Sequence, residues 1–96
     1  MIIAVDFDAT LANEKTRLPL PGARHVLKAL VEKGHEVYIL TAREEVDHGV
    51  IKDWLRLHGF PQNIEVTNIK KNHTRVIIDD RAIRFTNWSD ISKYFL

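Results

Sequence analysis

The chain has 96 residues, a formal net charge of +1 and no cysteine, and 45% of its residues are hydrophobic. The length is that of one domain, so we expect a single domain over residues 1–96. The small net charge argues against a nucleic-acid binder that works by charge alone, and the lack of cysteine excludes disulfides, thiolate nucleophiles and Cys-ligated zinc. No apolar run approaches the roughly 20 residues of a membrane span, and the first strand leaves no room for a signal peptide. We therefore expect a soluble, cytoplasmic protein without a membrane partner.

The first element is a short apolar run that ends in two carboxylates. Residues 2–5, Ile-Ile-Ala-Val, are followed by Asp6-Phe7-Asp8-Ala9-Thr10. This pattern predicts a buried strand whose last residues emerge at one edge of a sheet, where a metal ion or a phosphate can reach them.

Turn signals and helical periodicity place the elements that follow. The polar, proline-containing stretch 12–22 predicts a loop, and apolar residues at helical spacing predict a helix over 23–33 that Gly34 ends. The remaining expected elements are a strand over 37–40, a helix over 44–58, a short strand over 64–67, a strand over 76–79 and a last short helix that Ser89 caps.

The strand near the other end repeats the pattern of the first. Val76-Ile77-Ile78 is closed by Asp79-Asp80, so four acidic groups converge if the two strands lie side by side. Two carboxylates about 4 Å apart repel by roughly 4 kcal/mol at an effective dielectric near 20, which calls for a cation. Mg²⁺ is the natural candidate because it takes oxygen ligands and keeps positions for water and phosphate.

Alternating strands and helices predict an α/β fold with a mainly parallel sheet and right-handed crossovers. A Rossmann-like, three-layer arrangement with strand order 3-2-1-4 puts Asp6 and Asp79 at the switch point, where ligands bind in such sheets. Thr41, at the end of the second strand, would face the same edge.

In this order and spacing, the motifs resemble those of the haloacid dehalogenase superfamily of phosphohydrolases. Asp6-Phe7-Asp8-Ala9-Thr10 is similar to its first motif, Thr41-Ala42-Arg43 to its second, Lys71 to its third and Asp79-Asp80 to its fourth. The resemblance implies a magnesium-dependent phosphomonoester hydrolase, that is, a phosphatase, acting through an aspartyl-phosphate.

The expected catalytic groups follow from this chemistry. Asp6 would attack phosphorus, and Asp8 would protonate the leaving oxygen and later deprotonate the attacking water. Thr41 and Lys71 would stabilise phosphoryl charge. The substrate-binding residues expected are Thr10, Ala42, Arg43 and Arg81, and the metal-binding residues expected are Asp6, Asp8, Asp79 and Asp80.

Several alternatives remain open in the sequence. Lys70 competes with Lys71, which we prefer for its spacing to Asp79, and either Asp79 or Asp80 is the direct metal ligand. Thr41 also fits a capping box with Glu44. Ala9 stands where the family usually has glycine, and alanine is tolerable there if φ is negative. With this substitution and the minimal size, the alternative function is a weakly active or inactive Mg²⁺- and phosphate-binding module.

No cap domain fits between the motifs, so the site is expected to be open. Similarity to the nucleotidases and to the phosphatase part of a phage polynucleotide kinase favours a nucleotide or polynucleotide end as substrate, and a homo-oligomer would make small phosphates plausible. Of the aromatic residues, Trp54 and Trp88 are expected in the core. We expect surface or helix-cap positions for His25, His35, His48 and His58, and a place at the edge of the site for His73.

Overall fold

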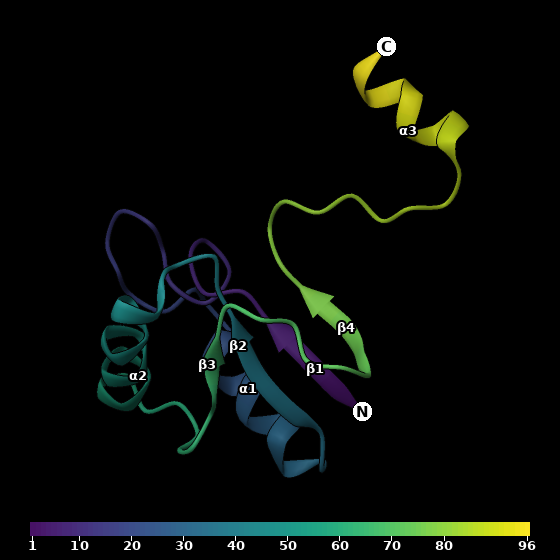
Figure 1. Cartoon of the computed structure of the whole chain (residues 1–96). Helices are drawn as coiled ribbons and strands as arrows, with labels where there is room; N and C mark the ends of the chain where they lie inside the picture. The colour runs from purple at the N-terminus through teal and green to yellow at the C-terminus, as the bar shows by residue number, and fades with distance from the viewer.

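The computed structural model describes residues 1–96 as a parallel four-stranded sheet with helices on one face and a C-terminal arm that leaves the sheet (Figure 1). The strands are β1 (Ile2–Val5), β2 (Glu36–Leu40), β3 (Val66–Thr67) and β4 (Thr74–Ile78). Their order is β3-β2-β1-β4, and every neighbouring pair is parallel. The α/β class and the strand order expected from the sequence are confirmed.

The helices begin and end close to the predicted residues. They are α1 (Ala23–Glu32), the 3₁₀ turn η1 (Glu45–Asp47), α2 (His48–Leu57) and α3 (Trp88–Phe95). The predicted helix from residue 44 is thus split, with a 3₁₀ turn before α2. The last helix is capped by Asn87, whose side chain accepts the N–H of Asp90 at 2.8 Å, and not by Ser89 as predicted.

The hydrophobic core lies between one face of the sheet and the helices α1 and α2. The pairing of Ile3 with Val37 and of Val5 with Ile39 places these four side chains on the same face. They form one buried cluster with Leu27 of α1 and with residues of α2, β3 and the loops, namely Phe7, Leu11, Ala12, Ile51, Trp54, Leu55, Phe60, Ile64 and Val66. Trp54 is in the core, as predicted.

The opposite face is covered by a loop where the three-layer expectation placed a helix. Ala4 and Tyr38 are paired across β1 and β2 and are fully buried, yet they lie outside the helical core. The crossover 68–73 lies against them, since the Lys71 N–H donates to the Tyr38 hydroxyl at 3.0 Å and Thr74 Oγ1 lies 2.7 Å from the same oxygen.

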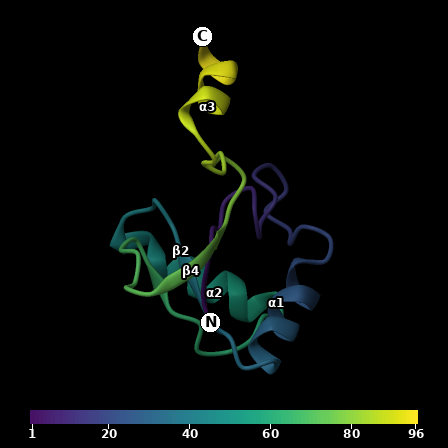
Figure 2. The same ribbon diagram turned by 90° about the vertical axis from the view of Figure 1, so that its right-hand side faces the viewer.

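Residues 82–96 form an arm that stands clear of the sheet and of α1 and α2 in both ribbon views (Figures 1 and 2). The radius of gyration is 14.5 Å, whereas a globular chain of this length has about 12.5 Å. Trp88 of the arm is 75% exposed, so its predicted core position is wrong. None of the helices has the length and apolar character needed to cross a membrane.

Candidate active site

Three strands deliver polar side chains to one edge of the sheet. Asp6 directly follows β1, and its N–H donates to the carbonyl of Ile78 at 2.9 Å, which ties the end of β1 to the end of β4. Thr41 directly follows β2, and its N–H donates to the carbonyl of Thr67 at 3.0 Å. Because all four strands are parallel, Asp6, Thr41 and Asp79 lie at the same carboxyl edge, as predicted.

A tight turn anchored by a buried phenylalanine holds the two acids of the first motif. Phe7 is 1% exposed, and its ring packs edge-on against Trp54 with centroids 5.0 Å apart. Its carbonyl lies within 3.3 Å of the backbone nitrogens of three following residues, which donate to it: Thr10, Leu11 and Ala12. The buried ring and the bonded carbonyl therefore fix the directions in which the neighbouring acids leave the backbone. Thr10 Oγ1 lies 3.4 Å from Asp6 Oδ2, so Thr10 contacts the expected nucleophile.

 Ala9 has φ +63°, in the left-handed region. The negative φ that would make alanine tolerable at this position is therefore not observed. A side chain in this region costs roughly 1–2 kcal/mol, and glycine avoids the steric part of that cost. The first motif therefore contains a strained alanine directly after Asp8.

Asp6 lies among like charges. Burial raises the pKa of Asp6 above its usual value, and the carboxylates of Asp80 and Asp79 raise it further, whereas a hydrogen bond from the Phe7 N–H lowers it. Of the two acids after β4, Asp80 has the stronger influence on Asp6. The Asp79 carboxylate accepts the N–H groups of Arg81 and Ala82 at 2.9 and 2.8 Å, and these bonds lower the pKa of Asp79. Asp79 thus shapes the turn after β4, while Asp80 is the neighbour of Asp6.

Asp8 is held by two arginines. Arg43 forms a bidentate pair with it, from Nε to Oδ2 at 2.9 Å and from Nη2 to Oδ1 at 2.7 Å, and Arg17 Nη1 lies 3.4 Å from Oδ1. Both guanidinium groups lie over the ring of Phe7, at 5.5 Å for Arg43 and 5.9 Å for Arg17. Hydrogen bonds from Arg43 are the main reason why the pKa of Asp8 is below its usual value. Arg43, expected as a substrate-binding residue, contacts the expected general acid in this structure.

The segment after β2 presents a free backbone donor. Thr41 is buried, and its hydroxyl accepts the N–H of Arg43 at 3.2 Å. The capping box with Glu44 is therefore not formed, because the threonine oxygen bonds two residues ahead and Glu44 itself flanks the 3₁₀ turn. The N–H of Ala42 has no hydrogen-bond partner in the structure and lies at the exposed edge, where it can receive an anion.

The structure does not bring Lys71 to the acidic edge. Its ammonium group pairs with Glu65 at 2.9 Å and Glu36 at 3.3 Å and lies 5.2 Å from the ring centroid of Tyr38. Glu36 begins β2 and Leu40 ends it, so these pairs lie roughly 13 Å along the strand from the site. The expected position of Lys71 is thus not observed, because two glutamates hold it near the other end of the sheet.

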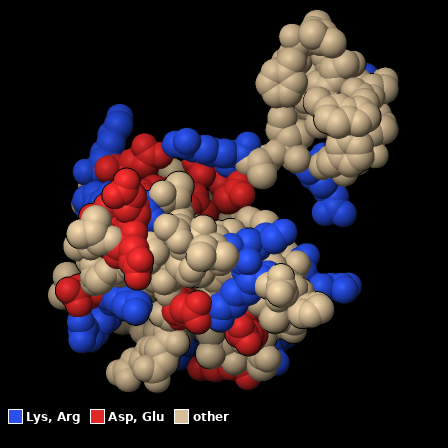
Figure 3. Space-filling view, in the orientation of Figure 1, with Lys and Arg blue, Asp and Glu red and all other residues tan.

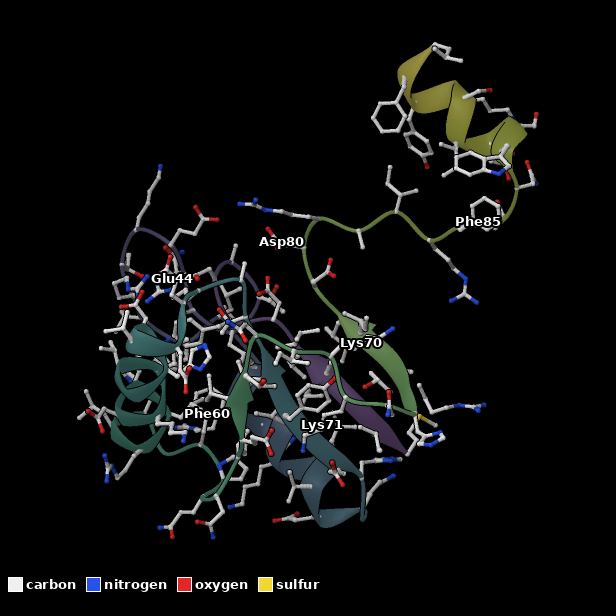
Figure 4. All side chains as sticks on the ribbon, viewed as in Figure 1. Glu44, Phe60, Lys70, Lys71, Asp80 and Phe85 are labelled. Atoms are coloured by element: carbon white, nitrogen blue, oxygen red, sulfur yellow. The ribbon has the colours of Figure 1, made fainter.

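Lys70 is better placed than Lys71. The crossover 68–73 starts at the carboxyl edge, where β3 ends, and reaches the opposite edge, where β4 begins. Earlier residues of this crossover therefore lie nearer to the site, and in Figure 4 Lys70 lies toward Asp80 relative to Lys71. Lys70 forms no ion pair in the structure. His73, expected at the edge of the site, lies next to the start of β4 at the opposite edge.

The oxygen atoms at this edge fit a magnesium ion in kind. The carboxylates of Asp6 and Asp80 are neighbours, and the backbone carbonyl of Asp8 accepts no hydrogen bond. No three His, Asp or Glu side chains are grouped closely enough to hold a metal by themselves. Mg²⁺ is usually bound through one or two carboxylates together with water and substrate phosphate, so this set of donors is chemically suitable.

The edge is open to solvent. In the space-filling view, acidic side chains gather at the base of the arm with basic side chains beside them (Figure 3). Arg81, expected to bind substrate, has a side chain that is 85% exposed, and its Nε lies 3.9 Å from Asp80. Two hollows of about 560 and 650 Å³ are lined by other residues, around Pro19–Gly22 and around α2 and residues 60–65. The carboxylates therefore lie outside both hollows.

Two residues at this edge were missed by sequence reasoning. Arg17 pairs with Asp8, and its carbonyl accepts the indole N–H of Trp54 at 2.7 Å, although nothing in its polar loop signals this. His48, expected at a surface or cap position, is 9% exposed, and its Nε2 lies 3.0 Å from the carbonyl of Arg43. A histidine on the buried face of the predicted helix was the available signal. Both residues position the pair formed by Asp8 and Arg43.

Comparison with known proteins agrees with this fold. The family model of the haloacid dehalogenase-like hydrolases matches residues 3–95. A solved structure of a conserved protein from Bacteroides thetaiotaomicron is similar, with a TM-score of 0.68 and 26% sequence identity over 97% of this chain and 87% of that chain. No curated protein gives a significant match.

Proposed function

We propose, since this chain belongs to the haloacid dehalogenase-like hydrolases, that it is a magnesium-dependent phosphomonoester hydrolase with Asp6 as the nucleophile. The observation that carries the proposal is the placement of Asp6 beside Asp80 at the carboxyl edge of the sheet, with Thr41 and Asp79 at the ends of the two neighbouring strands. A bound Mg²⁺, held by Asp6, Asp80 and the Asp8 carbonyl, would offset the charge of these acids and of the phosphate. Asp79 would keep its role in the turn.

The chemical steps assign one task to each acid. A carboxylate oxygen of Asp6 would attack phosphorus, and the bond from phosphorus to the leaving oxygen would break as Asp8 gives that oxygen a proton. Water would then attack the phosphorus of the aspartyl-phosphate while Asp8 takes a proton from it, which releases phosphate and restores Asp6. The free N–H of Ala42, the Thr41 hydroxyl and Lys70 would stabilise the phosphoryl oxygens.

Arg43 has to change partner for this sequence to run. As long as it binds Asp8 through two hydrogen bonds, the carboxylate is stabilised as the anion and is a poor proton donor. A phosphate group is also a bidentate partner for a guanidinium. Arg43 would therefore turn to the incoming phosphate, and Asp8 would then be free to take up a proton.

The open edge favours a substrate that is large enough to exclude water from the site by itself. Arg43 and the exposed Arg81 flank the carboxylates and would contact a phosphate or a base, so we propose a nucleotide or a polynucleotide end as the substrate class. A small sugar phosphate would leave the reaction exposed to water unless a second subunit covers it.

The proposal is tested with an aryl phosphate, with and without Mg²⁺, on the parent chain and on Asp6→Asn. We expect metal-dependent hydrolysis that the substitution abolishes. Removing a carboxylate from among like charges should leave the fold at least as stable, so lost activity would not reflect unfolding. Asp53→Asn, at an exposed carboxylate of α2 paired with Arg56, is the matched control and should keep full activity. Hydrolysis that persists in Asp6→Asn, or that ignores Mg²⁺, would contradict the proposal.

A second candidate function is a module that binds Mg²⁺ and phosphate without turnover. It is favoured by the strained Ala9 and by the pairing of Asp8 and Lys71 with residues of the protein itself. Phosphate-dependent thermal stabilisation together with no hydrolysis across a broad substrate panel would support this second function over the first.

A further inference from the structure

Strand β4 and the arm that follows it both expose apolar surface. Val76, Ile77 and Ile78 of β4 are each more than 40% exposed, and β4 has a neighbour on one side only. Val76 and Ile78 are in register with Ile3 and Val5, so they lie on the face of the sheet that packs against α1 and α2, which is called the helical face below. These two side chains lie beyond the part of that face that the helices cover. An edge strand with exposed apolar side chains is a site for contact with another chain.

The arm carries a helix with no apolar partner. None of the residues of α3 is buried, and the apolar side chains exposed along the arm are Ile83, Phe85, Trp88, Tyr94, Phe95 and Leu96. The arm also carries three charged residues, Arg84, Asp90 and Lys93, but most of the surface of its helix that Figure 3 shows is uncharged, and Phe85 lies in the stretch before that helix (Figure 4). So many exposed apolar side chains within one short segment are typical of an interaction site.

Local bonds define the arm but do not account for its stability. Asp90 receives the hydroxyl of Thr86 at 2.6 Å and pairs with Lys93 at 3.3 Å, and Phe85 packs against Trp88 with centroids 5.4 Å apart. An isolated helix of eight residues is nonetheless marginal in water and needs a packing surface. The family match extends to residue 95, so α3 belongs to the part of the chain that the family model covers.

The direction in which the arm leaves determines which surface it can reach. The Asp79 carboxylate binds the N–H groups of Arg81 and Ala82, which holds the turn after β4 in a form that sends the chain away from the sheet. In this form α3 lies beyond the end of β4 and not alongside it (Figures 1 and 2). The exposed face of β4 in the same chain is thus left uncovered by its own arm.

We propose that two copies of this chain exchange their C-terminal arms, with α3 of each copy packed on the exposed apolar face of β4 of the other. Exchange of an identical element is a simple route to a symmetric dimer. The four exposed aromatic residues of each arm, with the surfaces that they cover, would bury on the order of 1,500–2,000 Å² in the dimer, which is the size of a stable interface. Since the arm starts beside Asp80, the exchange would also bring the second copy next to the open carboxylates.

The test combines mass measurement with cysteine pairing, which is clean because the chain has no cysteine. Light scattering on the full chain should give a dimer. One chain carrying Val76→Cys, on the helical face of β4, and a second, longer-tagged chain carrying Tyr94→Cys should form a disulfide between the two chains after mixing. A chain carrying both substitutions should cross-link to its partner and not within itself.

A variant with a matched control distinguishes dimerisation through the arm from non-specific association through exposed apolar residues. Trp88→Ser combined with Phe95→Ser should weaken dimerisation by roughly 30-fold or more. Leu57→Ser, at an apolar residue of α2 that is 79% exposed, should leave it unchanged. Circular dichroism should show a folded sheet in both variants, because the arm does not contact the core. A monomer, a disulfide within one chain, or a dimer that forms no disulfide between positions 76 and 94 would overturn the proposal.

Discussion

Strands β1 and β4 have nearly the same sequence pattern but very different surroundings. Both are short apolar runs that end in carboxylates, and they lie side by side in the sheet. β1 lies between two strands, with Ile3 and Val5 buried under the helices and Ala4 buried under the crossover 68–73, whereas the apolar residues of β4 are more than 40% exposed at an open edge. This pattern therefore specifies a strand and the place of its acids, while burial of the strand depends on the surface that the rest of the chain, or another chain, packs against it.

The role of Asp8 as proton donor can be distinguished from the role of Asp6 as nucleophile by varying the leaving group of the substrate. Asp8→Asn should slow hydrolysis of esters with leaving groups of high pKa by on the order of 10²–10⁴-fold, since these groups need a proton. Esters with leaving groups of low pKa should be affected much less. The measurement is kcat across a series of aryl and alkyl phosphates, and an equal loss across the series would show that Asp8 is not the proton donor.

Matched isoleucines on the two strands test the comparison directly. Ile3→Ala should lower the free energy of unfolding by about 2–5 kcal/mol at every protein concentration, because it leaves a cavity in the core. Ile78→Ala, on the same face of the sheet, should cost less than about 1 kcal/mol in dilute solution, as expected for a partly exposed side chain. Its cost should rise with protein concentration if a second copy covers β4. Urea titrations at two concentrations measure both effects, and equal costs in dilute solution would break the comparison.

Arg43→Gln should lower stability at neutral pH by up to about 1 kcal/mol, the upper range for a partly exposed ion pair. The pKa of Asp8 is lowered in the folded chain, so its stabilising contribution is present above the unfolded pKa and is lost as the pH falls through the folded value. The difference between parent and variant should therefore shrink as the solution is acidified below that folded value. A difference that stays constant down to the lowest pH would show that the pair with Asp8 is not its source.

Ala9→Gly should raise the free energy of unfolding by about 0.5–1 kcal/mol, because it removes steric strain at a positive φ, while the added entropy of the unfolded chain offsets part of that gain. Ala12→Gly, in the same turn but at a buried alanine, is the control and should be destabilising. Thermal melts compare the two variants, and a destabilising Ala9→Gly would mean that the turn is not strained.

The sequence was sufficient for those parts of the fold that depend on local pattern. Apolar runs and acid-ended strands predicted the sheet order and brought Asp6, Thr41 and Asp79 to one edge, as the structure shows. The positions of Lys71 and Trp88 were not predictable in this way. Lys71 pairs with Glu36, which begins β2, and with Glu65, which directly precedes β3. The exposure of Trp88 depends on the direction in which the turn at Asp79 sends the arm. These are long-range contacts that spacing along the chain does not encode.

The positive φ of Ala9 was also beyond the sequence. The turn in which Thr10, Leu11 and Ala12 donate to the Phe7 carbonyl contains Ala9 at a positive φ, and the sequence has no glycine there to indicate it. The pair of Asp8 with Arg43 was missed for a related reason. The charge of Arg43 predicts a contact with phosphate, but spacing along the chain does not show that its guanidinium lies within reach of the Asp8 carboxylate.

The central claim, that Asp6 is a nucleophile, is tested most directly by looking for its phosphorylated form. The chain is mixed with Mg²⁺ and a rapidly reacting aryl phosphate, quenched in acid and digested, and its peptides are examined by mass spectrometry. We predict one added phosphoryl group on the peptide that contains Asp6, with more of it in Asp8→Asn, where its hydrolysis is slowed. Release of phosphate without any such peptide, or a phosphoryl group on another residue, would contradict the account.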